Sequence, residues 1–154
     1  MIKRRIKFEG NNLKVILGCG NTKKDGWIGL DIGEYNQDIR WDLRDGLPFP
    51  DNSCAELFAD QVLEHIQLNE DYIFLMNECL RVLKPGGIFE IQVPFWDNEV
   101  AFKDPTHCRF FCKQTFHYME AINDWEYGFD KRWKVKVSEV LGGSQVHAIL
   151  IAEK

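Results

Sequence analysis

Apolar residues along this chain gather in short runs that end at turn-forming residues, a pattern typical of strands. Five runs predict strands over residues 13–18, 27–31, 39–42, 54–60 and 88–93. Two later runs, at 133–141 and 146–153, flank Gly142-Gly143 and predict a hairpin at the end of the chain.

Helical spacing of apolar residues is clearest between Asn69 and Leu83. The predicted apolar face consists of Ile73, Met76, Leu80 and Leu83. Asn69 is the predicted N-cap, and Lys84-Pro85-Gly86-Gly87 should end the helix because proline cannot continue the hydrogen-bond ladder. A second helix is predicted over 112–122.

The early connections are too short for crossover helices of ordinary length. Six residues separate Gly20 from Trp27, and seven separate Asp31 from Ile39. We therefore predict an α/β fold with a mostly parallel sheet, an antiparallel C-terminal strand and a reduced set of helices. By the handedness of parallel connections, both predicted helices should lie mainly on one face of the sheet.

Several predicted strands alternate between polar and apolar residues. Glu90 and Gln92 alternate with Phe89, Ile91 and Val93. Strands buried on both faces are instead continuously apolar. The alternation predicts a two-layer structure in which the second face of the sheet is exposed to solvent or covered by a partner chain. In the second case we expect a homodimer formed through that face.

Composition narrows the class of protein. The chain has 154 residues, of which 45% are hydrophobic, and is expected to form a single domain over 1–154. A formal net charge of −5 argues against nucleic acid as a partner, and we interpret Lys3-Arg4-Arg5 as a solvated strand edge. No signal-peptide pattern or membrane-length apolar run is present, so we expect no membrane association and a cytoplasmic location.

The five cysteines have no pattern of a disulfide framework, and we expect free thiols. His107, Cys108, Cys112 and His117 cluster in the sequence, but their spacing matches no common zinc site. The sequence therefore predicts no bound metal.

The motif Leu17-Gly18-Cys19-Gly20 ends the first predicted strand, and Asp31 ends the second. Glycine permits close approach of the backbone to a ligand, and a carboxylate can accept both hydroxyls of a ribose. A dinucleotide fingerprint needs a third glycine, where this chain has Lys23. With no Tyr-x3-Lys pair either, nicotinamide chemistry is disfavoured, and the pattern favours a phosphate-free adenosyl ligand.

Five motifs in order resemble those of class I S-adenosylmethionine-dependent methyltransferases, closest to the small type 11 methyltransferase-domain group. They are Leu17-Gly18-Cys19-Gly20-Asn21, Gly26-Trp27-Ile28-Gly29-Leu30-Asp31, Asp42-Leu43 with Leu47-Pro48-Phe49, Val62-Leu63-Glu64-His65-Ile66, and Leu80-Arg81-Val82-Leu83-Lys84-Pro85-Gly86-Gly87. The resemblance covers nearly the whole chain and implies S-adenosylmethionine as cofactor.

The resemblance also implies cofactor contacts. Gly18 and Gly20, with Leu17 and Cys19 beside them, would line the methionine part. The remaining implied contacts are Asp31 at the ribose with Ile32 next to it, Asp42 and Leu43 near the adenine, and Ala59, Asp60 and Gln61 near the sulfonium and amino group. For Asp31 and Asp42 the alternative is a purely local role as turn or helix caps.

Glu64-His65 is similar to part of the Glu-x-x-Glu-His metal site of ubiquinone-type O-methyltransferases. Because Gln61 stands where that site has its first carboxylate, we interpret Glu64-His65 as organising the turn into the next helix. Asp104 and His107 follow the fifth strand and are the candidate catalytic residues, His107 as a general base. The alternative is that Asp104 caps a turn and His107 donates to a backbone carbonyl.

These observations predict transfer of a methyl group to oxygen or nitrogen of an unidentified acceptor, with a small molecule expected. The competing hypothesis is a module that binds S-adenosylmethionine or S-adenosylhomocysteine without catalysis of its own and acts with a partner chain.

Overall fold

A computed structural model describes residues 10–121 and 126–154 of the chain. The strands are β1 (Leu13–Leu17), β2 (Ile28–Asp31), β3 (Ile39–Arg40), β4 (Cys54–Asp60), β5 (Leu83–Pro94), β6 (Trp133–Leu141) and β7 (Gln145–Ala152). The α-helix α1 covers Asn69–Val82, and short 3₁₀ helices are η1 (Leu43–Asp45), η2 (Leu63–His65), η3 (Glu99–Ala101) and η4 (Thr115–Met119). Within these ranges no helix is long and apolar enough to span a membrane.

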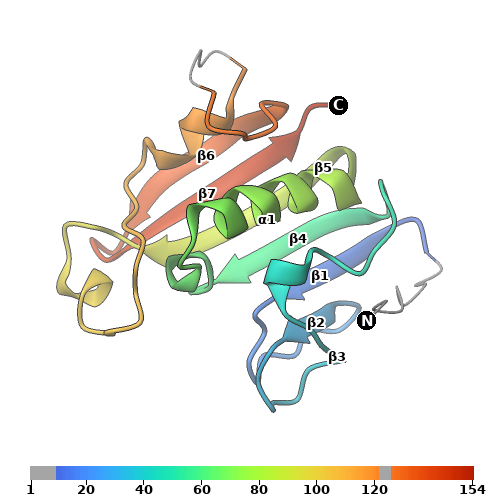
Figure 1. Ribbon diagram of the computed structural model, residues 1–154, viewed down its shortest axis with the longest axis horizontal. Helices are drawn as coiled ribbons and strands as arrows, with labels where there is room; N and C mark the ends of the chain where they lie inside the picture. The colour runs from blue at the N-terminus through green and yellow to red at the C-terminus, as the bar shows by residue number, and fades with distance from the viewer. Residues whose placement is uncertain (1–9, 122–125) are drawn as a thin grey trace.

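All seven strands form one sheet in the order β3-β2-β1-β4-β5-β7-β6 (Figure 1). The first five strands run parallel, and β7 lies antiparallel between β5 and β6. The predicted mostly parallel α/β sheet with an antiparallel C-terminal strand is therefore confirmed. Lys3-Arg4-Arg5, predicted as a strand edge, lies outside the described residues.

Helix α1 crosses the middle of one sheet face, as Figure 1 shows. Its predicted N-cap is wrong, because Leu68 occupies the cap position and Asn69 Oδ1 instead accepts from Arg109 Nη2 at 3.1 Å. Of the predicted apolar face, Met76, Leu80 and Leu83 are buried as expected, but the buried face also includes residues that were not predicted. Tyr72 and Cys79 are buried whereas Ile73 is only partly buried.

The second predicted helix, over 112–122, is wrong. Within its described part only the 3₁₀ helix η4 forms. The Thr115 hydroxyl accepts from the backbone N–H of Cys112 at 2.9 Å, a local bond that competes with helical pairing. Glu120 then forms bridges to Arg132 and Trp133, and its carboxylate accepts from the Val135 N–H at 2.8 Å. Both contacts draw the chain into extended pairing beside β6.

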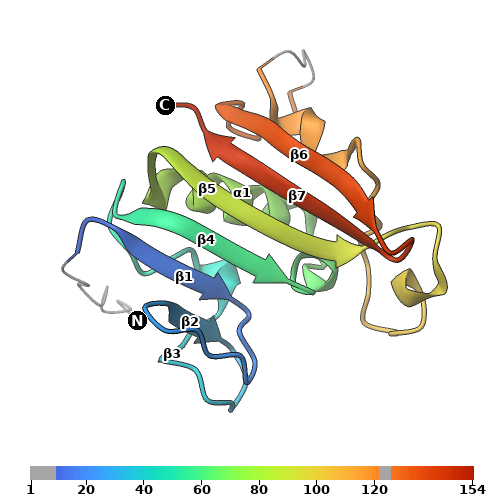
Figure 2. The ribbon, with the colours of Figure 1, turned by 180° about the vertical axis from the view of Figure 1, so that it is seen from behind.

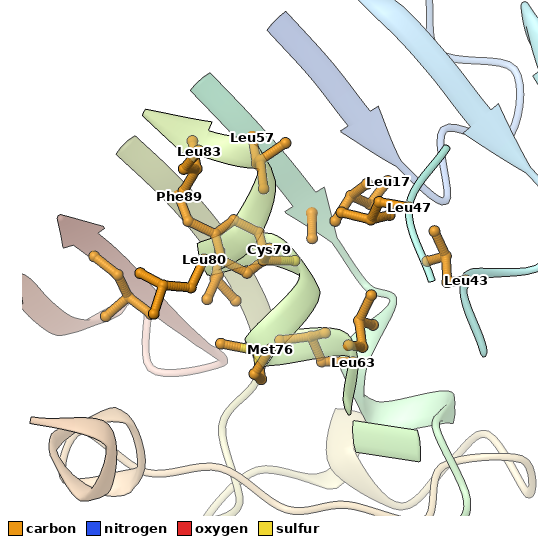
Figure 3. Packing of buried hydrophobic residues seen from close by; sticks show 14 of the residues in the cluster. Leu17, Leu43, Leu47, Leu57, Leu63, Met76, Cys79, Leu80, Leu83 and Phe89 are labelled. Atoms are coloured by element: carbon orange, nitrogen blue, oxygen red, sulfur yellow. The ribbon is translucent and has the colours of Figure 1, made fainter. Parts of the chain in front are cut away.

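The hydrophobic core lies between α1 and the sheet (Figure 3). Met76, Cys79 and Leu80 of the helix point toward Leu57 of β4 and Phe89 of β5, and all five are at most 1% exposed. Farther along the same face, Phe116 of η4 stacks on Phe111 with ring centroids 5.8 Å apart. The predicted placement of helices on one face is confirmed.

The opposite face of the sheet carries no helix in the described part of the chain, as the rear view in Figure 2 shows. Side chains alternate between faces along a strand, so the residues between core positions point to this side. Across β4, β5 and β7, one row runs Phe58, Glu90, Ile149, and the row beside it runs Glu56, Ile88, Ile151. We call these six residues the open face.

Arg81 anchors α1 to the segment that precedes β4. Its guanidinium donates to the carbonyl oxygens of Leu47 and Phe49, both at 3.0 Å. It also pairs with Asp51 at 2.7 Å and Glu78 at 2.6 Å, and the hydrogen bonds to Glu78 raise its pKa. These contacts fix the prolines of residues 47–50 against the helix.

Candidate cofactor and acceptor site

The candidate site lies at the carboxyl edge of the parallel strands. In the sheet order, β1 stands between β2 and β4, so the chain leaves these strands in opposite directions across the sheet. A crevice forms outside the carboxyl ends at such a point, and ligands of open α/β sheets bind there.

The turn after β1 needs glycine at Gly18. Its φ is +63°, and a Cβ there would lie 2.5 Å from Val62 Cγ2. An L side chain at this position would therefore be strained in its backbone and would collide with the segment after β4. The two loops consequently pack directly against one another at the crevice.

Asp31 fixes this turn to the end of β2. One carboxylate oxygen accepts from the backbone N–H of Gly20 and the other from that of Gly33, both at 2.8 Å. The local capping role considered from the sequence is thus present. Each oxygen still has a lone pair for a further donor, since an ionised carboxylate offers about four acceptor positions.

A pocket of about 600 Å³ opens beside this turn. Predicted cofactor residues that line it are Gly18, Asp31, Ile32, Asp42, Leu43 and Gln61. Tyr35, Trp41, Val62, His65 and Leu68 add apolar and aromatic walls that the sequence did not indicate. A crevice with apolar walls and a few polar groups is the usual form of a small-molecule site.

The other predicted cofactor residues lie around this pocket but are not among its lining. Leu17 and Ala59 are at most 1% exposed and belong to the core. Cys19 is buried against Gly29, and burial raises the pKa of its thiol. Gly20 is engaged with Asp31, and Asp60 is exposed at the end of β4.

Asp42 lines the pocket and also caps η1. Its carboxylate accepts from the Arg44 backbone N–H at 2.9 Å and pairs with the Arg44 guanidinium at 2.7 Å. The hydrogen bonds to Asp42 raise the pKa of Arg44. The cap predicted as the alternative for Asp42 is therefore formed, on the wall of the same pocket.

Asp38 links the loop after β1 to β2, a role that was not predicted. Its carboxylate accepts from the Gly29 N–H and pairs with Lys23 Nζ, both at 2.7 Å. The Gly29 bond and, after it, Lys23 lower the pKa of Asp38. This arrangement joins the loop after β1 to the connection between β2 and β3 without a helix.

A second pocket of about 360 Å³ adjoins the first. Its lining residues are Gln61, His65, Val100, Lys103, Asp104, His107, Ser144 and Gln145. Gln61 and His65 line both pockets and form their common boundary. Gln61 has a φ of +55°, a conformation that non-glycine residues rarely adopt and that clusters at functional sites.

The two candidate catalytic residues lie at this second pocket. Asp104 Oδ1 accepts from the backbone N–H and the hydroxyl of Thr106, each at 2.8 Å, and these bonds lower its pKa. His107 Nδ1 lies 3.1 Å from the carbonyl oxygen of Ala101. A carbonyl can only accept, so Nδ1 carries a proton, and in the neutral form of the ring the lone pair is at Nε2. The predicted alternative contacts of both residues are present, and Nε2 is left for other chemistry.

Glu64 is the site residue that sequence reasoning undervalued. Its side chain is fully buried, and neither carboxylate oxygen has a hydrogen-bond partner among the described residues. Burial raises its pKa to about 7. Oε1 lies 3.9 Å from His107 Nε2. A carboxylate four residues after the end of β4 and next to a histidine was the available signal, but only the fold joins it to His107.

The loop from Asp104 to Arg109 is fixed to the segment around η2. The Cys108 N–H donates to the Glu64 carbonyl at 2.9 Å, and Arg109 Nε donates to the Ile66 carbonyl at 2.6 Å. Of the residues considered as a zinc cluster, Cys112 contacts Thr115 and His117 pairs with Glu120. Among the described residues, the set of possible metal ligands around His107 is instead Glu64, His65 and His107.

The strand order and the crevice at its carboxyl edge define an α/β domain of the Rossmann-like class. Residues 28–91 match the family model described as a methyltransferase domain. A probable S-adenosylmethionine-dependent methyltransferase of Mycolicibacterium smegmatis is 39% identical over 85 residues, which cover 49% of this chain and 31% of that protein. The chain thus spans about a third of the length of that curated relative.

Solved structures share the fold over nearly the whole chain. A chain of the Haloferax volcanii complex between the Trm112 methyltransferase activator and a methyltransferase has a TM-score of 0.69 at 17% identity, covering 96% of this chain and 84% of its own. Burkholderia thailandensis 1,6-didemethyltoxoflavin-N1-methyltransferase, solved with S-adenosylhomocysteine, has a TM-score of 0.66 at 11% identity, covering 94% and 72%. Residues 28–91 are thus similar in sequence to methyltransferase domains, and the chain as a whole shares the Rossmann-like fold of these solved structures.

Proposed function

We propose that this domain binds S-adenosylmethionine in the larger pocket and transfers its methyl group to an acceptor in the smaller one. The observation that carries the proposal is the meeting of the two pockets at Gln61 and His65. Methyl transfer requires the donor carbon and the acceptor atom in line and shielded from water. Two adjoining pockets at one sheet edge suit that requirement.

The residues of the larger pocket fit the cofactor. Gly18 lines this pocket and would face the methionine part, and Asp31 offers acceptors for the ribose hydroxyls. Asp42 and the backbone of Leu43 would face the adenine, between the aromatic walls of Tyr35 and Trp41. Ala59, Asp60 and Gln61 would lie toward the sulfonium and amino group. S-Adenosylmethionine itself supplies an activated methyl group on a positively charged sulfur.

The acceptor is proposed to be a small molecule that receives the methyl group on oxygen or nitrogen. An acceptor that arrives protonated has to release its proton near the point of attack. Asp104 and His107 line the acceptor pocket and are the proposed catalytic groups at this end. Lys103 in the same lining favours an acceptor with an anionic group.

Calorimetry with S-adenosylhomocysteine tests the cofactor part, because the product binds without turnover. We expect saturable one-to-one binding that Asp31→Asn weakens and Asp25→Asn, an exposed change in the neighbouring loop, does not. Transfer from radiolabelled S-adenosylmethionine to a fractionated small-molecule extract tests catalysis. No S-adenosylhomocysteine binding at millimolar concentration would overturn the proposal.

The second candidate is a cofactor-binding module that a partner chain completes. The open face favours it, because Phe58, Ile149 and Ile151 lie there among charged side chains and no helix covers them in the described structure. We propose a second copy of this chain as the occupant. On the same side of the sheet Glu56 pairs with Lys14 at 2.6 Å and Glu90 lies 3.0 Å from His147 Nε2, so these carboxylates already have partners and need no compensation from a second copy in a two-fold contact.

All five cysteines are free thiols. Free thiols are typical of a reducing compartment, which supports the proposed cytoplasmic location.

A further inference from the structure

We propose that Glu64, His65 and His107 together bind a divalent transition-metal ion at the boundary between the two pockets. The inference rests on the proposed methyl transfer and specifies how the acceptor is activated. It assigns His107 as a metal ligand, so that the metal rather than a free imidazole acts on the acceptor's proton. It also replaces the expectation from the sequence that no metal binds.

The ligand atoms are already close together. One ligand atom from each of the three residues lies within 4.8 Å of the other two. His107 Nε2 is 3.9 Å from Glu64 Oε1, and the two imidazole rings meet edge to face at 4.8 Å. Ligands around a metal held at about 2.0–2.2 Å lie roughly 3–4 Å apart. Small side-chain adjustments are therefore enough to close the set.

Hydrogen bonds on the far side of each ring leave a lone pair for the metal. The Thr106 hydroxyl donates its hydrogen to Asp104, so it can only accept from His65 Nδ1, 2.9 Å away. His107 Nδ1 donates to the Ala101 carbonyl. In the neutral form of each ring, the lone pair is consequently at Nε2. Metal-ligating histidines are oriented by such outer partners almost without exception.

The environment of Glu64 is independent evidence that a cation binds here. Its carboxylate is fully buried without a hydrogen-bond donor, and such a group is costly unless it is paired or coordinates a metal. Its nearest recorded ion-pair contact among the described residues is His107 Nε2, at 3.9 Å. A divalent ion between them would compensate the carboxylate and join the loop after β5 to the segment after β4.

Two imidazoles and one carboxylate favour zinc, iron(II) or cobalt(II) over magnesium, which prefers an all-oxygen shell. A three-residue set would leave coordination positions open, and His65 and His107 line the pocket that also contains Gln61 and Lys103. These positions suit an acceptor hydroxyl. Bound there, the hydroxyl loses its proton to water more readily. Its oxygen then bonds to the methyl carbon while the carbon–sulfur bond breaks and its electrons go to sulfur.

The test is a titration of chelator-treated protein with Co²⁺, followed by its visible absorption, and with Zn²⁺ by competition. Wild type should bind one ion per chain, with Mg²⁺ unable to displace it. Glu64→Gln and His107→Ala should each weaken binding by about 100-fold or more. Thr106→Val, which removes only the partner of His65, should weaken it by about 10–100-fold. His147→Gln removes the imidazole between Glu90 and Glu139 and should change nothing.

Measuring S-adenosylhomocysteine binding to each variant distinguishes a failure of the metal-site proposal from a failure of the proposed function. Wild type that binds S-adenosylhomocysteine but no metal would overturn the metal site and leave the methyltransferase proposal intact. Metal binding that survives Glu64→Gln and His107→Ala but falls with His147→Gln would likewise overturn it. A His107→Ala protein that loses its fold is replaced by Glu64→Gln, which keeps the shape of the side chain. Absence of S-adenosylhomocysteine binding in wild type would count against the proposed function itself.

Discussion

Asp31 Oδ2 accepts a hydrogen bond from the backbone N–H of Gly20 at 2.8 Å, so the end of β2 holds the turn that follows β1. Gly33 donates to the other oxygen of the same carboxylate at 2.8 Å. One side chain therefore shapes the rim of the larger pocket and presents its remaining lone pairs to a ligand there.

Asp31→Asn should weaken S-adenosylhomocysteine binding by about 10–100-fold, because hydrogen bonds to a charged acceptor contribute about 1.5–3 kcal/mol. The amide also cannot accept with its nitrogen, so one of the two glycine contacts is lost. Isothermal titration calorimetry measures the change. Asp25→Asn serves as the control, and equal affinities of the two variants would refute the ribose assignment.

Gly18→Ala should destabilise the protein by about 1–2 kcal/mol through its left-handed backbone conformation alone. The new Cβ also meets Val62, which adds to the loss and moves the loop at the pocket. Urea unfolding quantifies this, and Gly18→Ala combined with Val62→Ala isolates the collision. Partial recovery is expected in the double variant, while no recovery at all would place the whole effect in the backbone.

Asp38 should stabilise the fold only above acidic pH. Its pKa is lowered in the folded state, so its contribution is present above the unfolded value and is lost as the pH falls through the folded one. The side chain is 43% exposed, which limits the effect to below about 1 kcal/mol. The stability difference between wild type and Asp38→Asn should therefore be seen at pH 7 and shrink below about pH 4. A stability difference between the two proteins that stays constant down to pH 2.5 would show that protonation of Asp38 does not affect stability.

Arg81→Met should cost about 2–4 kcal/mol, because it removes the cation paired with the partly buried Glu78 carboxylate and a hydrogen-bond donor to two carbonyl groups. Thermal and urea unfolding measure the loss. Lys136→Met on β6 removes a charge from an exposed position and should stay within about 0.5 kcal/mol of wild type. Similar losses in both variants would show that the network around Arg81 contributes nothing specific.

Ile149→Glu should prevent self-association if the open face joins two copies. Sedimentation of wild type should then give twice the chain mass of 18.0 kDa, and the variant a single chain. Phe74→Glu introduces the same charge at an exposed residue of α1 and should leave the dimer unchanged. A wild-type monomer at high concentration would reject the second copy and leave a different protein partner as the alternative.

The strands could be predicted because each is a short apolar run bounded by turn residues, and the missing crossover helices followed from counting residues between Gly20 and Ile39. The helix over 112–122 could not be excluded, since the pairing of Glu120 with β6 depends on residues that lie far along the chain. Similarly, Asn69 has a side chain typical of an N-cap, but its Oδ1 accepts a hydrogen bond from Arg109 instead.

The residues of the candidate site also fall into those that could be predicted from the sequence and those that could not. Gly18 and Asp31 have local signatures, because a positive φ and a strand-terminal carboxylate are visible in a short window of sequence. Glu64 and His107 are separated by more than forty residues, and their encounter arises from the register of β4 and β5. A sequence motif describes residues at fixed spacing within one segment, so it cannot identify a site whose residues come from two separate loops.

The connections among β1, β2 and β3 have a consequence for folding. These strands have no α-helix of their own in the described structure, and β3 is only two residues long. This edge of the sheet should therefore exchange its amide hydrogens faster than the half under α1 and open before it. A nucleoside bound against Asp31 and Asp42 would then stabilise this part of the sheet, as a packed helix does elsewhere. Binding of the ligand and ordering of β1, β2 and β3 would therefore be coupled.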